Sequence, residues 1–269
     1  PDLAAKCSVP WSKGGAANVR CCTSDLTLAE FRRLKGRADH VDKAAGNVEG
    51  YLAPRADAIE AWGRLMTHRE SIRLFADKGV RFIPELKKPQ IDMPMADGYG
   101  RQDYARQLVE DYAAEGVSPA DVQLQSFSLD DVRYWLTHHP EHAAGVIFLD
   151  GRYRDSGFDP ARPESWSPGM EELRDIGLRH IAPPLWVLLS LDGQGRIVPS
   201  PYARAARAAS LEITTWTVER SGPLSGGGGW YHQTVKPAIN NEGDVFTVID
   251  VLVRQVGVTG IFSDWPATV

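Results

Sequence analysis

The sequence predicts an α/β fold, and three observations indicate which kind. From residue 80 onward, short apolar runs rich in β-branched residues alternate with segments of helical periodicity, as in a parallel sheet with right-handed crossovers. Several expected strands run directly into polar or aromatic residues, where a TIM barrel carries its substrate-facing groups. No glycine-rich phosphate-binding turn follows a strand, which argues against a dinucleotide-binding sheet. The pattern therefore favours a TIM (β/α)8 barrel, whose usual length the 269 residues match.

Six strands and five helices are expected in this region. The strands are Val80–Leu86, Asp121–Phe127, Gly145–Asp150, Leu178–Pro183, Glu212–Val218 and Gly260–Asp264. The helices are Asp103–Glu115, Leu129–His138, Gly169–Ile176, Pro201–Ala209 and Val245–Val256. The second of these follows Ser128, a good N-cap, and the third follows a serine–proline start signal. Six strands fit an open sheet or part of an eight-stranded barrel, and the strand ends favour the barrel.

The first 80 residues differ from the rest. A helix is predicted around Thr27–Lys35, a loop-rich stretch follows to about Gly63, and a second helix is predicted over Thr67–Lys78. None of these segments has the pattern of a barrel strand. We expect one domain over residues 1–269, with residues 1–66 as a loop-rich insertion that contains one helix.

Composition excludes two classes of protein. The net charge is −5 and there is no long basic run, so a nucleic acid is not an expected partner. The longest apolar stretches, such as Ile181–Leu189, are too short and too interrupted by proline to cross a bilayer. The oligomeric state cannot be predicted from these features.

All three cysteines lie in the first 22 residues, at positions 7, 21 and 22. Neither a Cys-x-x-Cys pair nor a nearby histidine completes a zinc site. We expect a disulfide between Cys7 and either Cys21 or Cys22, which would suit a secreted protein. The odd count suggests a further cysteine upstream of Pro1.

The run Gly79–Lys87 is the most informative segment for chemistry. Its apolar strand ends in Glu85 and Lys87, which point to the same side because strand side chains alternate. A carboxylate beside an ammonium at a barrel mouth suits a hard metal ion and a phosphate. An ordinary ion pair that closes the strand explains the local pattern nearly as well.

Several segments taken together resemble the glycerophosphodiester phosphodiesterase family, in order and with plausible spacing. The matching segments are CCTSDLTLAEFRRLKG, FIPELK, DVQLQSFSLDDV, VIFLD, TTWTVERSG and GVTGIFSDWP, which run from about residue 20 to Pro266. The resemblance implies a barrel enzyme that hydrolyses glycerophosphodiesters to glycerol 3-phosphate and an alcohol. It also implies a divalent metal cofactor, Ca²⁺ or Mg²⁺. The long insertions and the cysteine-rich start are most similar to secreted members, which implies an extracellular or periplasmic location.

The same resemblance assigns roles to five residues. Glu85 would be a metal ligand, and Lys87 would contact the phosphate or the glycerol hydroxyls. Gln125 and Ser126 would line the site beside them, and Trp216 would form an apolar wall or pack in the core. Two aspartates at other strand ends remain open. Asp264 is expected to anchor the last loop, and Asp150 is as well suited to a metal as to an anchor.

The sequence lacks the motifs that carry the catalytic histidines and the Glu-x-Asp carboxylates in the family. Family members begin with a His-Arg-Gly motif on the first strand and Glu-x-Asp on the second, and a further histidine follows. None of these motifs occurs here, and His68-Arg69-Glu70 falls within an expected helix. We therefore predict no catalytic residue in this chain and expect an incomplete barrel without its first two strands. The missing part would be about 60–100 residues upstream, and the chain alone would be inactive.

Two alternatives remain on the sequence alone. A glycoside-hydrolase-like barrel would need two carboxylates about 5–9.5 Å apart, such as Glu85 with Asp150 or Asp264. A non-catalytic barrel could bind a phosphodiester or a partner through the same strand ends. The glycine-rich run Ser225–Gly229 is expected to be a flexible loop after the strand that carries Trp216.

Overall fold

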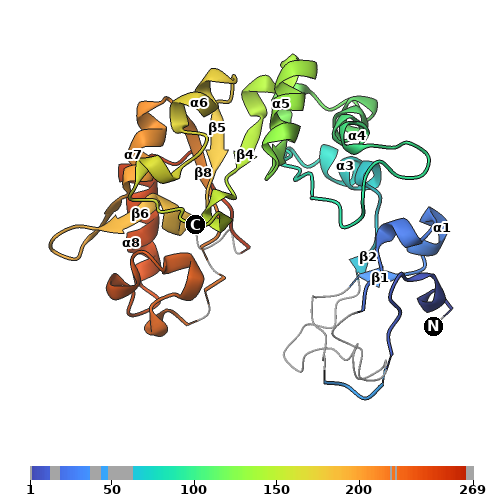
Figure 1. Ribbon diagram of the computed structural model, residues 1–269, viewed down its shortest axis with the longest axis horizontal. Helices are drawn as coiled ribbons and strands as arrows, with labels where there is room; N and C mark the ends of the chain where they lie inside the picture. The colour runs from blue at the N-terminus through green and yellow to red at the C-terminus, as the bar shows by residue number, and fades with distance from the viewer. Residues whose placement is uncertain are drawn as a thin grey trace. The chain divides into compact units, whose positions relative to one another are not determined.

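The structure is a computed structural model that describes residues 2–12, 19–36, 44–47, 63–218, 220–221 and 223–264. The chain divides into two compact units, Pro1–Lys78 and Gly79–Val269 (Figure 1). This division falls after the second expected helix, Thr67–Lys78. Most of the expected loop-rich stretch, including His40, lies outside the described residues.

The first unit is held together by local caps and one disulfide. It contains α1 (Leu28–Phe31), α3 (His68–Ala76) and an antiparallel pair, β1 (Lys35–Gly36) with β2 (Gly63–Arg64). Both helices start with a capping box in which a threonine and a glutamate three residues later satisfy exposed backbone donors. The disulfide joins Cys7 to Cys21, which resolves the two expected pairings, and Cys22 is a free thiol.

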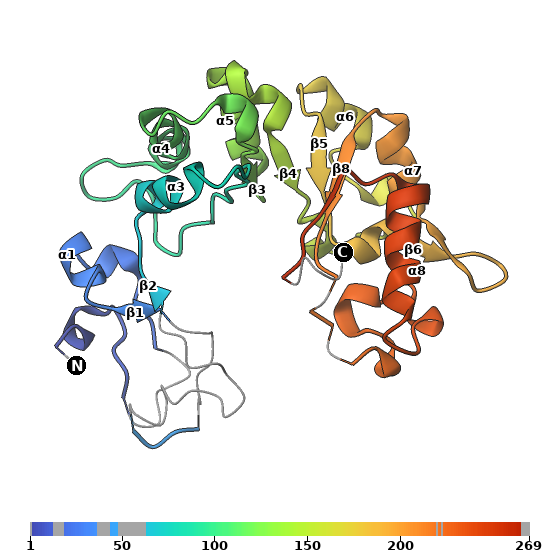
Figure 2. The ribbon, with the colours of Figure 1, turned by 180° about the vertical axis from the view of Figure 1, so that it is seen from behind.

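The second unit is built on a five-stranded parallel sheet whose strand order follows the chain. The strands are β3 (Gln125–Ser126), β4 (Ile147–Leu149), β5 (His180–Ala182), β8 (Glu212–Thr215) and β9 (Gly260–Ile261). Parallel bridges from Phe82 to Val122 and from Glu85 to Gln125 add the Val80–Leu86 segment at the β3 edge. All six expected strand positions are thereby confirmed as neighbours in order, as in an incomplete barrel; β4, β5 and β8 stand side by side in Figure 2.

The expected helices of this unit are confirmed to within a few residues. They are α4 (Arg101–Ala114), α5 (Leu129–His138), α6 (Met170–Asp175), α7 (Pro201–Ala208) and α8 (Asp244–Asp250). The expected helix over Val245–Val256 changes to a π-helical turn at Val251. None of the helices in the described part of the chain is long and apolar enough to span a membrane.

A hairpin that the sequence did not predict lies between β5 and α7. Its strands, β6 (Leu189–Leu191) and β7 (Ile197–Pro199), pair antiparallel around the turn Asp192–Arg196. Gly195 adopts a positive φ of 77° in this turn, which favours glycine. The hairpin leads into Ser200, whose hydroxyl caps α7.

The barrel interior is packed by alternate residues of the central strands. Ile147, Leu149 and Ala182 are buried and form an apolar cluster, against which the rings of Phe127 and Trp216 pack. Strand side chains alternate between faces, so the other face of the sheet packs under the helices. Phe127 and Trp216 lie at the carboxyl ends of the strands, where this interior cluster ends.

Candidate functional site

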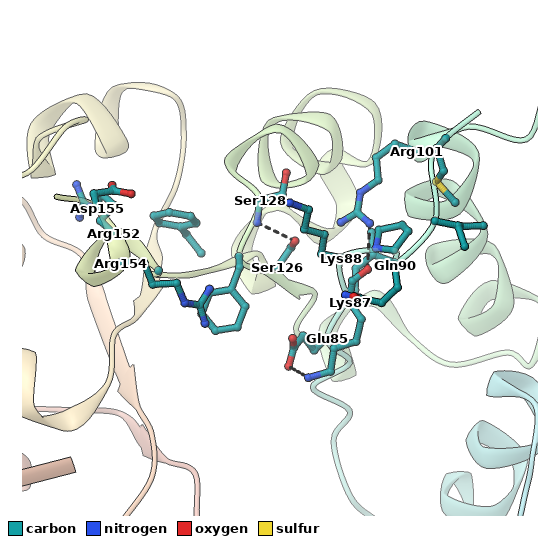
Figure 3. A pocket seen from close by; sticks show the side chains of 17 residues that line it. Glu85, Lys87, Lys88, Gln90, Arg101, Ser126, Ser128, Arg152, Arg154 and Asp155 are labelled. Atoms are coloured by element: carbon teal, nitrogen blue, oxygen red, sulfur yellow. Dashed lines mark hydrogen bonds and ion pairs between the residues drawn. The ribbon is translucent and has the colours of Figure 1, made fainter. Parts of the chain in front are cut away.

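A cavity of about 810 Å³ opens where the Glu85 segment, β3 and β4 end (Figure 3). Parallel strands bring their carboxyl ends to one edge, which is the usual position of a barrel's site. The volume lies in the ordinary range for small-molecule pockets. The charged side chains that line it are Glu85, Lys87, Lys88, Arg101, Arg152, Arg154 and Asp155.

Glu85 and Lys87 meet at this cavity as the strand alternation predicted. The Lys87 Nζ lies 2.8 Å from the Glu85 Oε2, and 74% of the lysine side chain is exposed against 24% of the glutamate. The glutamate is thus held against the strand end, while the lysine reaches into the open part of the cavity. This ion pair is compatible with both interpretations that the sequence allowed, a phosphate site and an ion pair that only closes the strand.

The residues around Glu85 do not assemble a metal site on their own. Within the described ranges, no group of three or more histidine, cysteine, aspartate or glutamate side chains could hold a metal ion. Ca²⁺ takes six to eight oxygen ligands, and Mg²⁺ is usually held by one or two carboxylates together with waters and substrate phosphates. Glu85 as a metal ligand therefore stays a prediction that needs ligands from outside the described residues.

Gln125 and Ser126, expected side by side in the site, point to opposite faces of β3. The Gln125 amide is buried and donates to the Ile83 carbonyl at 3.2 Å, and it does not line the cavity. Ser126 does line the cavity, but its hydroxyl donates to Asp131 at 2.6 Å. Arg101 also binds Asp131, with its Nε 2.8 Å from the carboxylate. Ser126 thus helps to hold α4 and α5 in place beside the cavity.

Trp216 belongs to an aromatic cluster that sequence patterns did not reveal. Its ring centroid lies 6.0 Å from those of Phe127, Tyr153 and Trp230, and its indole N–H donates to the Ala182 carbonyl at 2.9 Å. The cluster consists of Phe127, Tyr153, Trp186, Trp216, Trp230 and Tyr231. Phe127 also lines the cavity, so the cluster borders it through this ring.

Asp150 is an anchor, which settles the role that the sequence left open. Its carboxylate is 2% exposed and accepts from the Arg152 Nε at 2.9 Å and from the Tyr202 hydroxyl. Burial, followed by the nearby Asp150 charge, raises the pKa of Tyr202 well above its usual value. Asp264 likewise pairs with Arg220 at 2.5 Å, as expected for a loop anchor. Asp150 and Asp264 are the two carboxylates that could have acted with Glu85 in a glycoside hydrolase. Both are therefore paired with arginines.

Comparison with known proteins places the chain in a family. No family model matches the sequence. The chain is 43% identical over 213 residues to an "Extracellular protein" of Arthroderma benhamiae, a match that covers 77% of this chain and 84% of that protein. The chain belongs to the family of that protein.

Solved structures of other proteins share the fold of this family member. Proteins assigned as glycerophosphoryl diester phosphodiesterases from Silicibacter pomeroyi and Agrobacterium tumefaciens align with TM-scores of 0.56 and 0.51 at 18% and 15% identity. A glycerophosphodiester phosphodiesterase from Galdieria sulphuraria aligns with a TM-score of 0.54 at 13% identity. The alignments cover 90%, 93% and 96% of this chain and 66%, 72% and 73% of the others.

The chain thus spans just under two thirds of the length of the Silicibacter pomeroyi protein, at 66%. At such low identities the likeness concerns the fold. It confirms the TIM-barrel-type α/β fold, present as an incomplete barrel, that the sequence predicted.

Histidines in this fold take structural positions within the described residues, and none of them lines the cavity. His68 is the first residue of α3, as expected. His180, in β5, bonds Thr214 through its Nε2 at 2.7 Å inside the barrel. His232, beside the glycine-rich run, is fully buried and its Nδ1 lies 3.0 Å from the Gly228 carbonyl.

Burial of these histidines predicts a loss of stability in mild acid. Burial lowers the pKa of His142, His180 and His232 from the ordinary 6.5. Below pH 6.5 the unfolded chain binds protons that the folded protein does not, so stability falls with pH until each folded pKa is reached. A histidine that stays neutral when folded contributes about 1.4 kcal/mol of loss per pH unit.

Urea unfolding at pH 7.5 and 5.5 tests this prediction. We expect a lower midpoint at the acid pH, and a smaller difference for His180→Asn. Carboxylates contribute little in this window, because their unfolded pKa values lie near 4. Equal midpoints at the two pH values would show that these rings are protonated in the folded protein as readily as in the unfolded chain.

Proposed function

We propose that this protein is an extracellular phosphoric diester hydrolase that converts glycerophosphodiesters to glycerol 3-phosphate and an alcohol. The observation that carries the proposal is the Glu85–Lys87 pair at the rim of a cavity formed by strand ends. The fold shared with solved glycerophosphodiester phosphodiesterases supports it. A small-molecule substrate fits the size of the cavity.

Charge around the cavity supports an anionic substrate. Five cationic side chains line it against two carboxylates, although the chain as a whole carries a net charge of −5. The cations are Lys87, Lys88, Arg101, Arg152 and Arg154, and the carboxylates are Glu85 and Asp155. A concave surface lined by one sign of charge concentrates ligands of the opposite sign.

Lys87 and Glu85 have different roles in binding the phosphate. The ammonium of Lys87 binds a non-bridging phosphate oxygen, and the Glu85 carboxylate keeps the lysine side chain at the rim. Trp216 stands behind Phe127 and supports that wall of the cavity. Ser126 and Gln125 support the strand end from opposite faces. The groups that transfer protons are not assigned to residues of this chain.

A divalent metal cofactor, Ca²⁺ or Mg²⁺, stays a proposal. Glu85 lies beside Lys87, where a bound Ca²⁺ or Mg²⁺ would meet the phosphate, and Lys87 would have to move away from it. Because the described residues do not supply a ligand set, no step of the reaction is derived through a metal ion. When bound, such an ion would stabilise negative charge on the phosphate oxygens.

The extracellular location rests on two observations. The relative from Arthroderma benhamiae is named an extracellular protein. The Cys7–Cys21 disulfide is of the kind that forms and persists in oxidising compartments.

The reaction can be tested with the purified protein in its full natural length, because no proton-transferring group is assigned to residues 1–269. Release of glycerol 3-phosphate from glycerophosphocholine and glycerophosphoinositol would be followed with Ca²⁺, with Mg²⁺ and with a chelator. We expect Glu85→Gln to lower turnover roughly 100-fold or more, the usual cost of removing an electrostatic group at a reacting centre. Glu30→Gln is the matched control, because Glu30 also forms a lysine ion pair, with Lys6, in the other unit.

The outcomes separate the candidate functions. Turnover that Glu85→Gln does not change would remove Glu85 from the site. Glycerophosphodiester binding without turnover would leave the non-catalytic phosphodiester-binding barrel. Neither binding nor turnover would overturn the proposed function.

A further inference from the structure

Arg154 lies over two aromatic rings, whereas Arg101 and Arg152, the other described arginines of the cavity, each lie over one and also pair with an aspartate. Arg154 belongs to the short turn Arg152–Arg154 that follows β4. Its guanidinium carbon is 4.7 Å from the centre of the Phe127 ring and 5.0 Å from that of Tyr153. Two such cation–π contacts fix the position of an otherwise flexible cation while leaving its N–H edges uncovered.

Three other cations of the cavity each have a carboxylate partner. Lys87 pairs with Glu85 at 2.8 Å, Arg101 with Asp131, and Arg152 with Asp150. Within the described residues, the Arg154 side chain forms no ion pair and donates no hydrogen bond. Lys88 is also without an ion pair there, but no ring holds it in place. The nearby Asp155 is exposed, lines the same cavity and does not pair with Arg154.

The two ends of the cavity are lined by different segments of the chain. Figure 3 shows Glu85, Lys87 and Lys88 on one side and Arg152, Arg154 and Asp155 on the other, with Ser126 between them; the Arg154 side chain extends toward the middle. A phosphodiester bound at Lys87 would therefore direct its alcohol portion across the cavity to Arg154. At that position a planar guanidinium offers two parallel N–H groups, which match a carboxylate or a phosphate.

We propose that Arg154 determines specificity and selects glycerophosphodiesters whose alcohol carries an additional anionic group. The inference rests on the proposed function, because it places the phosphodiester at Lys87. A quaternary ammonium head group would be disfavoured. The Phe127 and Tyr153 faces that could attract it already hold the guanidinium, and the cation itself would repel it.

The test compares two ligands that differ by one phosphate. Binding of glycerophosphoinositol 4-phosphate and of glycerophosphoinositol to the full chain would be measured by calorimetry, with glycerophosphocholine as the cationic case. We expect the extra phosphate to tighten binding roughly tenfold or more, the size of one charge-assisted hydrogen bond. Arg154→Gln should reduce this difference to less than about twofold, even if it also weakens binding of both ligands through the loss of one cavity charge, and Arg154→Lys should keep part of it.

The control variant is Arg162→Gln, since Arg162 is an exposed arginine farther along the same loop that pairs with Asp159. It should behave as wild type. If the ligands bind but Arg154→Gln leaves the tenfold preference intact, or if no preference exists, the specificity role is wrong and the proposed function stands. If no glycerophosphodiester binds wild type, the proposed function fails and this inference fails with it.

Discussion

Asp150→Ala should destabilise the second unit by about 3–5 kcal/mol, the usual cost of breaking a buried ion pair from one side. The Arg152 guanidinium is only 6% exposed and would lose its carboxylate partner. The Tyr202 hydroxyl, which is fully buried and donates to the same carboxylate, would lose its acceptor. The cluster connects the end of β4 to α7, so both elements should loosen together. Urea denaturation of the full chain measures the loss.

Asp264→Ala is the matched control for that prediction. Asp264 is also an aspartate at a strand end with an arginine partner, but its side chain is 46% exposed and that of Arg220 is 63% exposed. Solvent screens such a pair, so we expect a change of no more than about 1 kcal/mol. Equal losses for the two variants would contradict the structural distinction between a buried anchor and a surface anchor.

Trp216→Ala should cost about 3–5 kcal/mol, as other truncations of large packed aromatic residues do. The indole packs on the interior cluster of Ile147, Leu149 and Ala182. It also stacks on Trp230, with the ring planes 24° apart, and meets the edge of Phe127. Its removal opens a cavity at the carboxyl ends of the strands and frees Phe127, which borders the candidate site. Ligand binding should therefore weaken along with stability.

Trp216→Phe separates packing from hydrogen bonding at this position. Phenylalanine retains much of the ring contact but leaves the Ala182 carbonyl without the indole donor at 2.9 Å. The carbonyl keeps its bond from the Asp150 N–H at 3.1 Å, so we expect a loss of about 0.5–1.5 kcal/mol, the net contribution of one hydrogen bond. A Trp216→Ala variant no less stable than Trp216→Phe would show that the aromatic cluster does not support the barrel end.

The periodicity of the sequence was sufficient to predict the frame of the second unit. Strands that are buried on both faces appear as short apolar runs, and the helices between them carry clear start signals such as Ser128 and Ser200. The hairpin β6–β7 was missed because its first strand continues an apolar run, Ile181–Leu189, that carried no separate strand signal. The change to a π-helical turn after Asp250 leaves no mark in the apolar spacing.

Individual site residues were harder to predict, because burial depends on distant parts of the chain. Glu85-x-Lys87 and Asp150-x-Arg152 have the same spacing, with an acid and a base on one side of the chain. One pair is largely exposed and the other is buried, and Tyr202, about fifty positions beyond Asp150, makes much of that difference. The grouping of Gln125 with Ser126 came from the family resemblance, although adjacent strand residues face opposite ways.

Aromatic contacts at the barrel end were the largest omission. Tyr153 and Trp230 come from irregular segments, where no periodicity marks a residue as packed. The glycine-rich run expected to be a flexible loop leads directly into Trp230 and Tyr231, which join the cluster. The available signal was a concentration of aromatic residues shortly after strand ends. Two of these residues, Phe127 and Tyr153, also position Arg154.

The central claim is that the Glu85–Lys87 rim binds the phosphate of a glycerophosphodiester, and a complex with sn-glycerol 3-phosphate tests it most directly. Amide chemical shifts of the labelled chain would be recorded during titration, with Lys87→Met as the comparison. We predict shifts concentrated at residues 85–88 and 126–128, which Lys87→Met abolishes. Shifts confined to other parts of the chain, or an unchanged titration in Lys87→Met, would contradict the account.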